Sequence, residues 1–204
     1  MNSIGEATKL NIADQVGQAV ASLKANGIDA RFVGGAEEVR REVFSIIPEG
    51  AEVMTMTSVT LDTFGISKEI NESGKYNSVR SELNAGGDKK KMKALGAAPE
   101  WAIGSVHAVT QDGKILIASN TGSQLPAYAY AAGKVVFVIG AQKIVKNFEE
   151  GMKRIYEHTL PLESERAKKA YGVPGSAVNK ILVINKEGEP GRIFAIIVNE
   201  EIGF

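Results

Sequence analysis

The chain has 204 residues, 44% of them hydrophobic, and its 24 basic residues balance its 24 acidic ones. This length suits one domain with a full core, and the composition is that of an ordinary folded α/β protein. The balanced charge gives no basic footprint for nucleic acid, so we expect no nucleic-acid partner. Since the sequence has no cysteine, disulfides, thiol nucleophiles and thiolate-bound iron–sulfur clusters on this chain are excluded.

The start of the sequence predicts neither export nor membrane anchoring. Residues 1–6 lack the basic start and apolar core of a signal peptide, and no apolar run approaches the roughly 18 residues that span a bilayer. We therefore expect a cytoplasmic protein without a membrane partner, folded as a single domain over residues 1–204.

The first part of the sequence alternates between helical and strand patterns. A helix ends at Asn26-Gly27 and precedes a strand over 28–33, and a second helix ends at Pro48. A strand over 51–56 then leads into a helix over 61–71. Such alternation predicts a mostly parallel sheet with helices on both faces. The apolar face of the first helix consists of Ile12, Val16, Ala19, Val20 and Leu23.

Residues 71–87 are polar and glycine-containing, which predicts a surface excursion or lid with Tyr76, Arg80 and Asn84 as its distinctive side chains. Asp88 then begins a short helix that carries four lysines within five positions. Such a run is typical of a solvated helix face, although it also resembles a phosphate patch.

The segment from Trp101 to Phe148 is the richest in turn and strand signals. Residues 105–110 and 114–118 predict a hairpin around the turn at 111–113. A polar loop over 119–124, a helix over 125–132 and a buried-type strand over 135–139 follow. Further on, the sequence predicts a helix over 147–158 and a charged helix-loop piece over 161–175. Strands over 179–185 and 192–199 predict a terminal β-hairpin.

Two stretches resemble the lactate-utilisation (LUD) domain family. The first is AIGSVHAVTQDGKILIASNTG at 102–122, and the second combines VIGAQKIV at 138–145 with FEEGMKRI at 148–155. Family members typically show a hydrophobic strand, a glycine, Lys-Ile-Val and an amphipathic helix. At the turn, many larger members have Glu-Thr-Gly where this chain has Gln111-Asp112-Gly113, so no role of that acidic residue is carried over. The likeness covers 94–155 and extends back to residue 51.

The resemblance implies a three-layer α/β/α fold with an open, mostly parallel sheet, as in sugar-phosphate isomerases, CoA transferases and folate cyclo-ligases. LUD members are associated with lactate oxidation beside partner subunits that carry iron–sulfur clusters. The resemblance therefore implies a small anionic metabolite as ligand, iron–sulfur protein partners and no cofactor held by this chain. A homo-oligomer is also compatible with it.

Polar residues follow three of the predicted strands, where ligands of open α/β sheets usually bind. We expect one pocket at the carboxyl ends of the strands over 51–56, 114–118 and 135–139, with Lys143 as a positive charge for a carboxylate or phosphate. The alternative is that the hydroxyl residues only cap helices and that Lys143 is an isolated surface lysine. The candidate ligand-binding residues are Thr57, Ser58, Thr60, Asn120, Thr121, Gly122, Ser123, Gly140 and Lys143.

Other chemistries find little support in the sequence. No glycine-rich nucleotide fingerprint is present, and His107 and His158 stand on unrelated elements without a metal-binding pattern. His107 is either a packed or surface residue or a proton-transfer group facing the loop over 120–122. Ser105 and His107 offer a nucleophile and a base, but they lack a third orienting group. No catalytic residue is assigned.

Three functions remain open at this point. The first is a LUD-type protein that binds a small anionic metabolite in lactate or related organic-acid utilisation, as a non-redox subunit. The second is a stand-alone enzyme of isomerase or CoA-transferase type that uses the same pocket, although no glutamate stands in a convincing motif. The third is a pure interaction module.

Overall fold

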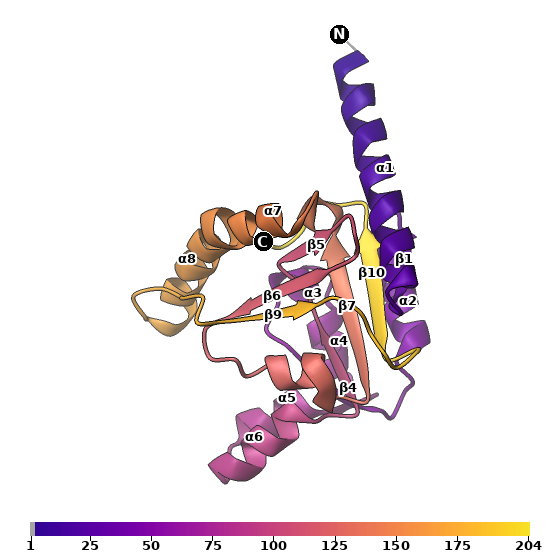
Figure 1. Ribbon diagram of the computed structural model, residues 1–204. Helices are drawn as coiled ribbons and strands as arrows, with labels where there is room; N and C mark the ends of the chain where they lie inside the picture. Colours follow the sequence, from indigo (N-terminus) through magenta and orange to yellow (C-terminus); the bar gives the residue numbers. More distant parts are fainter. Residues whose placement is uncertain (1–2) are drawn as a thin grey trace.

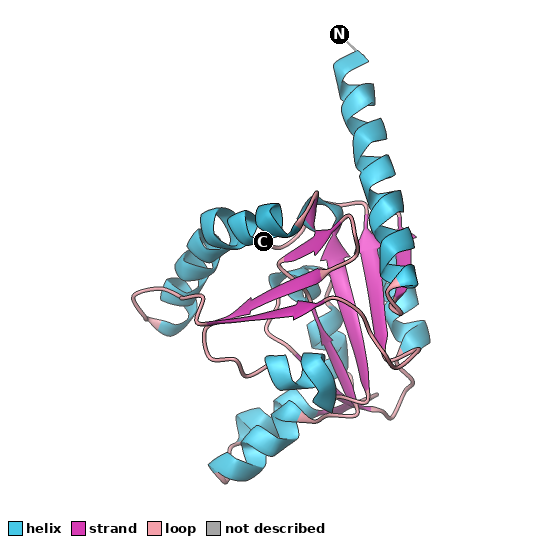
Figure 2. Cartoon of the chain, in the orientation of Figure 1, coloured by secondary structure: helices cyan, strands magenta, loops and turns pink. Residues whose placement is uncertain are grey.

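The computed structural model describes residues 3–204, with side chains described from Asp14 onward. Ile12, one residue of the predicted first helix face, lies outside the described side chains. The other four residues of that face belong to α1 (Ser3–Ala25), and Val16, Ala19 and Leu23 are buried. Figures 1 and 2 show α1 running along one side of a central sheet.

The central sheet has six strands, and every neighbouring pair is parallel. This confirms the predicted α/β fold with an open, mostly parallel sheet. Its middle strands are buried on both faces, as parallel sheets between helical layers require. In spatial order the strands are β1 (Asp29–Val33), β10 (Ile193–Val198), β7 (Lys134–Gly140), β4 (Trp101–Gly104), β2 (Glu52–Thr55) and β3 (Asn77–Ser78).

A second, four-stranded sheet packs beside the first. The predicted hairpin is confirmed in it, because β5 and β6 pair antiparallel around the turn at 111–113. The chain leaves the first sheet at Gly104 and enters the second at Ala108, so residues 105–107 form a crossing segment. In spatial order the strands are β8 (Ile144–Val145), β5 (Ala108–Thr110), β6 (Ile115–Ser119) and β9 (Lys180–Ile184).

Helices cover the sheets and connect their strands. The helix predicted over 61–71 is two helices, because Gly65 with φ of 67° ends the first turn and begins the next helix. The remaining elements in chain order are α2 (Ala36–Ile46), α3 (Val59–Thr63), α4 (Ile66–Glu72), α5 (Val79–Ala85), α6 (Lys89–Ala97), the π-helix η1 (Ala127–Ala131), the 3-10 turn η2 (Ala141–Lys143), α7 (Phe148–Arg154), the π-helix η3 (Ile155–Thr159) and α8 (Leu160–Tyr171).

Strand β7 shows how the core is divided. Val135, Phe137 and Ile139 point to the face that packs against α1, η1 and the second sheet, whereas Val136 and Val138 point to the face covered by α2, α3 and α4. This alternation follows the two-residue period of a strand, and each such side chain contributes roughly 1.5–3 kcal/mol on burial. A smaller cluster joins η3 to the outer face of the second sheet.

The predicted terminal β-hairpin is wrong. Strand β9 pairs with β6 in the second sheet, and β10 lies between β1 and β7 in the first sheet. The polar residues 186–191 therefore connect two sheets instead of closing a hairpin. The apolar run from Ile193 to Val198 is the signal that was misread, because an unbroken apolar run indicates a central parallel strand.

Two other segments differ in detail from the prediction. Residues 71–87 form the short edge strand β3 and helix α5, and Tyr76 is buried there with its ring stacked on Phe44. The helix predicted over 147–158 begins at the Asn147 cap as expected but continues through η3 into α8. The helical spacing of the sequence predicts a core face formed by Phe148, Met152, Ile155 and Tyr156, but Phe148 and Tyr156 are exposed.

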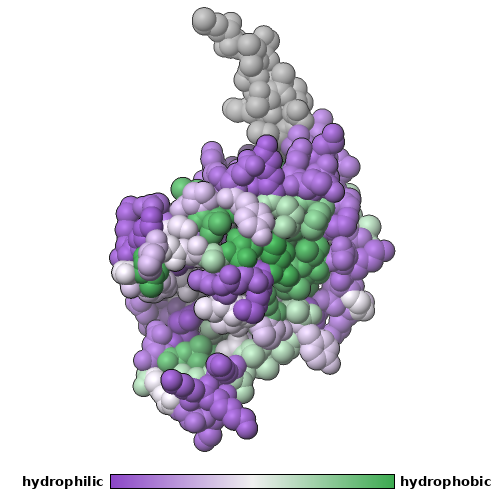
Figure 3. Space-filling model, turned by 60° about the vertical axis from the view of Figure 1, so that its left-hand side comes forward, coloured by the Kyte–Doolittle hydropathy of each residue, from purple (hydrophilic) through white to green (hydrophobic). Residues whose placement is uncertain are grey.

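The lysine run lies on the surface, as a solvated helix face requires. Lys89, Lys90, Lys91 and Lys93 are all exposed on α6, and Asp88 caps this helix. In Figure 3 the lower end of the molecule, where α6 lies, is covered by hydrophilic atoms.

Candidate functional site

A cavity of about 980 Å³ lies at the carboxyl ends of strands β2, β4 and β7. Residues after these strands form its floor, and the loop after β6 of the second sheet forms one rim. Helices α5 and α6 contribute to its wall on one side, and η3 and α8 contribute on the other. This volume is at the upper end of the range for small-molecule sites.

All of the predicted ligand-binding residues except Gly140 line this cavity. Gly140 instead packs beneath the end of the chain, where an ideal Cβ would lie 2.9 Å from Ile202 Cγ2. The three predicted loops therefore converge, although the loop after β6 reaches the cavity from the second sheet rather than from the first. Ligand binding by these residues stays a prediction.

The hydroxyl residues after β2 divide into a cap and a cavity residue. Ser58 Oγ accepts a hydrogen bond from the Leu61 amide at 3.4 Å, so Ser58 is the N-cap of α3, as the cap interpretation holds. Thr60 is buried and directs its hydroxyl toward Lys143. Helix α3 has only five residues, so its dipole makes a weak anion site.

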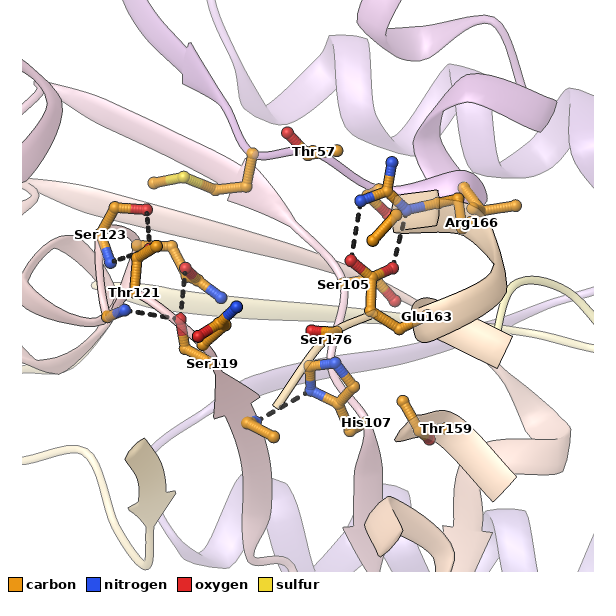
Figure 4. A pocket seen from close by; sticks show the side chains of 18 of the residues that line it. Thr57, Ser105, His107, Ser119, Thr121, Ser123, Thr159, Glu163, Arg166 and Ser176 are labelled. Atoms are coloured by element: carbon orange, nitrogen blue, oxygen red, sulfur yellow. Dashed lines mark hydrogen bonds and ion pairs between the residues drawn. The ribbon is translucent and has the colours of Figure 1, made fainter. Parts of the chain in front are cut away.

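The loop after β6 forms the rim rather than the floor of the cavity. Asn120, Thr121 and Ser123 are exposed, and Ser119 Oγ accepts the Gly122 amide at 2.8 Å. Gly122 has φ of 84°, so of the two reasons that the sequence offers for a glycine in this turn, positive φ or close approach of a ligand, the structure shows the first. Thr121 and Ser123 bond to each other and do not cap η1. Figure 4 shows this loop facing α8 across the cavity.

Lys143 is the buried cation of the site, so the alternative of an isolated surface lysine is wrong. Its side chain is 2% exposed, and Nζ donates to Ser105 Oγ at 3.0 Å and to Thr60 Oγ1 at 3.4 Å. Within the described part of the chain it has no ion pair with a carboxylate. Burial, and secondarily the charge of Arg154, lowers the pKa of Lys143 to about 7.

His107 lies on the crossing segment and is neutral. Its Nδ1 accepts the Ala118 amide at 3.0 Å, which leaves the proton of the neutral ring on Nε2. Burial, followed by the charges of Lys143 and Arg154, lowers the pKa of His107 to about 3. Arg154 Nη1 in turn donates to the His107 carbonyl and to Thr159 Oγ1, both at 3.0 Å.

Sequence reasoning did not assign three polar side chains of the cavity to the site. Arg80 donates through Nε and Nη2 to the Thr55 carbonyl at 3.0 and 2.6 Å, and it has no ion pair with a described carboxylate. Arg166 and Glu163 on α8 form two hydrogen bonds of 2.7 Å with each other (Figure 4). The sequence could have indicated the Glu163–Arg166 pair, because residues at i and i+3 of a helix are neighbours. It could not have indicated that the Arg80 side chain points into the cavity, because this depends on the fold.

The described residues offer neither a metal site nor a membrane-spanning helix. No group of three or more His, Asp or Glu side chains there could hold a metal ion. Likewise, none of the described helices combines the length and apolarity that crossing a bilayer demands.

The fold and the cavity define an α/β protein with a ligand-sized hollow at the carboxyl ends of a parallel sheet. More specifically, the chain belongs to the LUD domain family, whose model matches residues 16–198. This confirms the resemblance noted in the sequence. No curated protein matches the chain significantly.

Solved structures support the fold. A DUF162 family protein from Deinococcus radiodurans is similar with a TM-score of 0.53 and 11% identity, and the match covers 93% of this chain and 96% of that one. The eIF2B beta protein from Chaetomium thermophilum is also similar, with a TM-score of 0.38 and 18% identity over 56% of this chain and 41% of that chain. The second likeness is too weak to support an inference.

Proposed function

We propose that this LUD domain binds a small anionic metabolite in the cavity and serves the utilisation of lactate or a related organic acid. One observation carries the proposal. Lys143 and Arg80 both border the cavity, and neither has an ion pair with any carboxylate in the described part of the chain. Buried cations are normally paired, so a buried Lys143 and a half-buried Arg80 without ion pairs at one cavity favour a ligand that supplies the negative charge.

The charges of the cavity wall support the same ligand class. Among the described lining residues Glu163 is the acidic side chain, and Arg166 already neutralises it through two hydrogen bonds. The remaining cations give the cavity an excess of positive charge. A carboxylate or phosphate that accepted hydrogen bonds from Arg80 and Lys143 would gain charge-assisted contacts of roughly 1.5–3 kcal/mol each.

Lys143 makes the proposed binding dependent on pH. Burial and the charge of Arg154 lower the pKa of Lys143 to about 7, so the amine is mostly neutral above this pH. An anion is bound best by the charged form of the amine. Above pH 7 the amine must therefore take up a proton when the anion binds, which weakens binding. Anion affinity should fall as the pH rises through 7, and Arg80 should retain part of it because its guanidinium stays charged.

The proposed setting is a non-redox subunit beside iron–sulfur partners. The chain has no cysteine, so in an oxidation that needs such clusters another protein must supply them. The cytoplasmic location, the single-domain organisation and the homo-oligomer stay predictions. The alternative of an isomerase or CoA-transferase-type enzyme also stays a prediction, and Glu163 is a poor candidate nucleophile because Arg166 holds both of its oxygens.

Calorimetric titration tests the proposal. Lactate, pyruvate and a sugar phosphate are titrated into the wild-type protein, Arg80→Gln and Lys143→Met. We expect one of these anions to bind and each substitution to weaken it tenfold or more at pH 6. Lys90→Ala is the matched control, since it removes an exposed lysine of α6. Equal weakening by Lys90→Ala would indicate non-specific attraction, and binding that survives both cavity substitutions would contradict the proposal.

A further inference from the structure

Three side chains from separate segments form a hydrogen-bonded line at the floor of the cavity. Thr60 comes from α3, Lys143 from the turn η2 after β7, and Ser105 from the crossing segment after β4. The amine of Lys143 lies between the two hydroxyl groups, 3.4 Å from Thr60 Oγ1 and 3.0 Å from Ser105 Oγ. Folding therefore places Lys143, rather than the His107 of the sequence pattern, beside Ser105, and Thr60 is the third group.

The burial of the Lys143 amine between two hydroxyl groups is not explained by a need for stability. A buried amine without a carboxylate loses hydration, and an apolar side chain of similar length would fill the same space without that loss. A neutral amine, however, matches its surroundings. It can accept the Ser105 hydroxyl proton through its lone pair while it donates to Thr60 Oγ1, and serine hydroxyl hydrogens rotate to suit.

The burial of the two groups indicates which one meets a substrate. Lys143 is 2% exposed, whereas Ser105 is partly exposed and lines the cavity. Ser105 is therefore the more accessible of the two groups, and Figure 4 shows it on the same side of the cavity as Glu163 and Arg166. A nucleophile next to a base that a third group holds in place is the general arrangement of hydroxyl-based acyl transfer.

We propose that Ser105 is a nucleophile, with Lys143 as its general base and Thr60 as a positioning residue, for acyl transfer from a small ester or thioester that enters the cavity. The inference rests on the proposed function only in assigning the acyl donor to the same cavity. It goes beyond that function by adding a covalent step.

The step balances as an ordinary acyl transfer. Ser105 Oγ attacks the acyl carbon and forms a C–O bond while its proton passes to Lys143 Nζ. The bond from the acyl carbon to the leaving oxygen or sulfur breaks, and Lys143 returns the proton to that leaving group. Water then attacks the acyl-serine, with Lys143 taking its proton and restoring the Ser105 hydroxyl. The sum is the ester or thioester plus water giving the acid plus the alcohol or thiol.

The reaction needs Lys143 in its neutral form. Burial and the charge of Arg154 on α7 both disfavour a positive charge on this amine, and His107 on the crossing segment is neutral near pH 7 and adds no charge. The neutral amine that acts as base is therefore available above pH 7, so the acylation rate should rise with pH whereas anion affinity should fall. The two uses of the cavity can be separated by pH.

p-Nitrophenyl acetate is the probe, because it is uncharged and reports acylation through release of p-nitrophenolate. We expect the full chain to acquire one acetyl group on Ser105, located by peptide mass spectrometry, at a rate that rises through pH 7. Ser105→Ala should abolish this label. Lys143→Met should slow it about 100-fold or more, the usual effect of losing a general base.

Ser176→Ala is the matched control. Ser176 also lines the cavity but has no hydrogen bond to Lys143, so its substitution should leave the reaction unchanged. Circular dichroism and thermal unfolding establish that each variant is folded. The proposal would be overturned if the folded wild type showed neither an acetyl group on Ser105 nor faster release of p-nitrophenolate than Ser105→Ala, or if Lys143→Met reacted at the same rate. Because the probe carries no charge, labelling without anion binding would overturn only the proposed function, and anion binding without labelling only the serine mechanism.

Discussion

Two buried basic side chains of this protein have opposite surroundings. Arg192, at the amino end of β10, is 5% exposed and pairs with Glu187 at 2.8 Å while it also donates to the Tyr128 and Ala132 carbonyls. Lys143, beyond the carboxyl end of β7, is 2% exposed, and within the described part of the chain its amine hydrogen-bonds to the hydroxyls of Ser105 and Thr60 and to no carboxylate.

The difference separates a structural cation from a functional one. Arg192 has its charge neutralised within the fold, and its guanidinium ties the connection before β10 to η1. Among the described residues Lys143 has no such counter-charge, and burial, followed by the charge of Arg154, lowers its pKa. The buried cation at the amino end of β10 is therefore satisfied within the fold, whereas the buried cation beyond the carboxyl end of β7 borders a cavity without a described counter-charge. Function is expected at the second place.

The largest effect should follow from breaking the satisfied pair. Arg192→Met leaves Glu187 with little exposure and no counter-charge, which should lower the free energy of unfolding by roughly 3–5 kcal/mol. Urea denaturation measures this value. A loss below about 1 kcal/mol would show that Arg192 is not the structural cation described above.

At low pH Lys143→Met should raise the free energy of unfolding, whereas Arg192→Met should lower it. The pKa of Lys143 is about 7 in the folded protein against an ordinary 10.5, so between these values the unfolded state binds the extra proton. The free-energy cost of burying the charged amine is therefore fully present below pH 7. As the pH rises from 7 to about 10.5 this cost disappears, and the free energy of unfolding of the wild type increases. The variant should be more stable than the wild type by a few kcal/mol at pH 6, with the difference shrinking toward pH 10. A variant that is less stable at every pH would contradict the comparison.

Gly122→Val sharpens the distinction between the floor and the rim of the cavity. The substitution forces φ of 84° on a branched residue, and its Cβ would lie 2.6 Å from Lys180 Cδ. The strain should reduce stability by only about 1–3 kcal/mol, so the domain stays folded, while the displaced rim should abolish anion binding. Thermal unfolding and calorimetry give the two values. Full binding in the folded variant would restrict the site to the floor around Lys143.

The smallest change in stability is expected from Thr60→Val. The substitution keeps the shape of the side chain and removes one hydrogen bond of 3.4 Å, which should cost about 1 kcal/mol. The amine then loses its orienting partner, so acetylation of Ser105 should slow about tenfold while the fold persists. An unchanged rate would remove Thr60 from the mechanism.

Much of the central sheet could be predicted from the sequence because its strands are short apolar runs between turn signals. The segment after β9 shows where this reasoning ends. Local spacing favoured a hairpin, but the side chains from Ile193 to Val198 need apolar neighbours on both faces, and only the middle of the first sheet provides them. Local turn chemistry was overridden by burial.

The candidate site was predicted in its loops but not in its chemistry. Polar residues after strands could be read directly, and those loops do converge. The contact between Lys143 and Ser105 joins residues 38 positions apart, and it arises because the chain changes sheets over 105–107. Arg80 enters the cavity from a segment that was expected to be a surface excursion. Such contacts depend on tertiary packing, which one sequence does not reveal.

The pKa of Lys143 tests the central claim most directly. Heteronuclear NMR of the protein labelled with ¹³C and ¹⁵N in its lysines can follow each side chain through a pH titration, and Lys143→Met identifies the resonance that belongs to this residue. The unpaired, buried amine at the cavity predicts a midpoint near 7. A midpoint near the ordinary 10.5 would show that the amine is solvated or paired, and would contradict the account of this cavity as a site with an uncompensated cation.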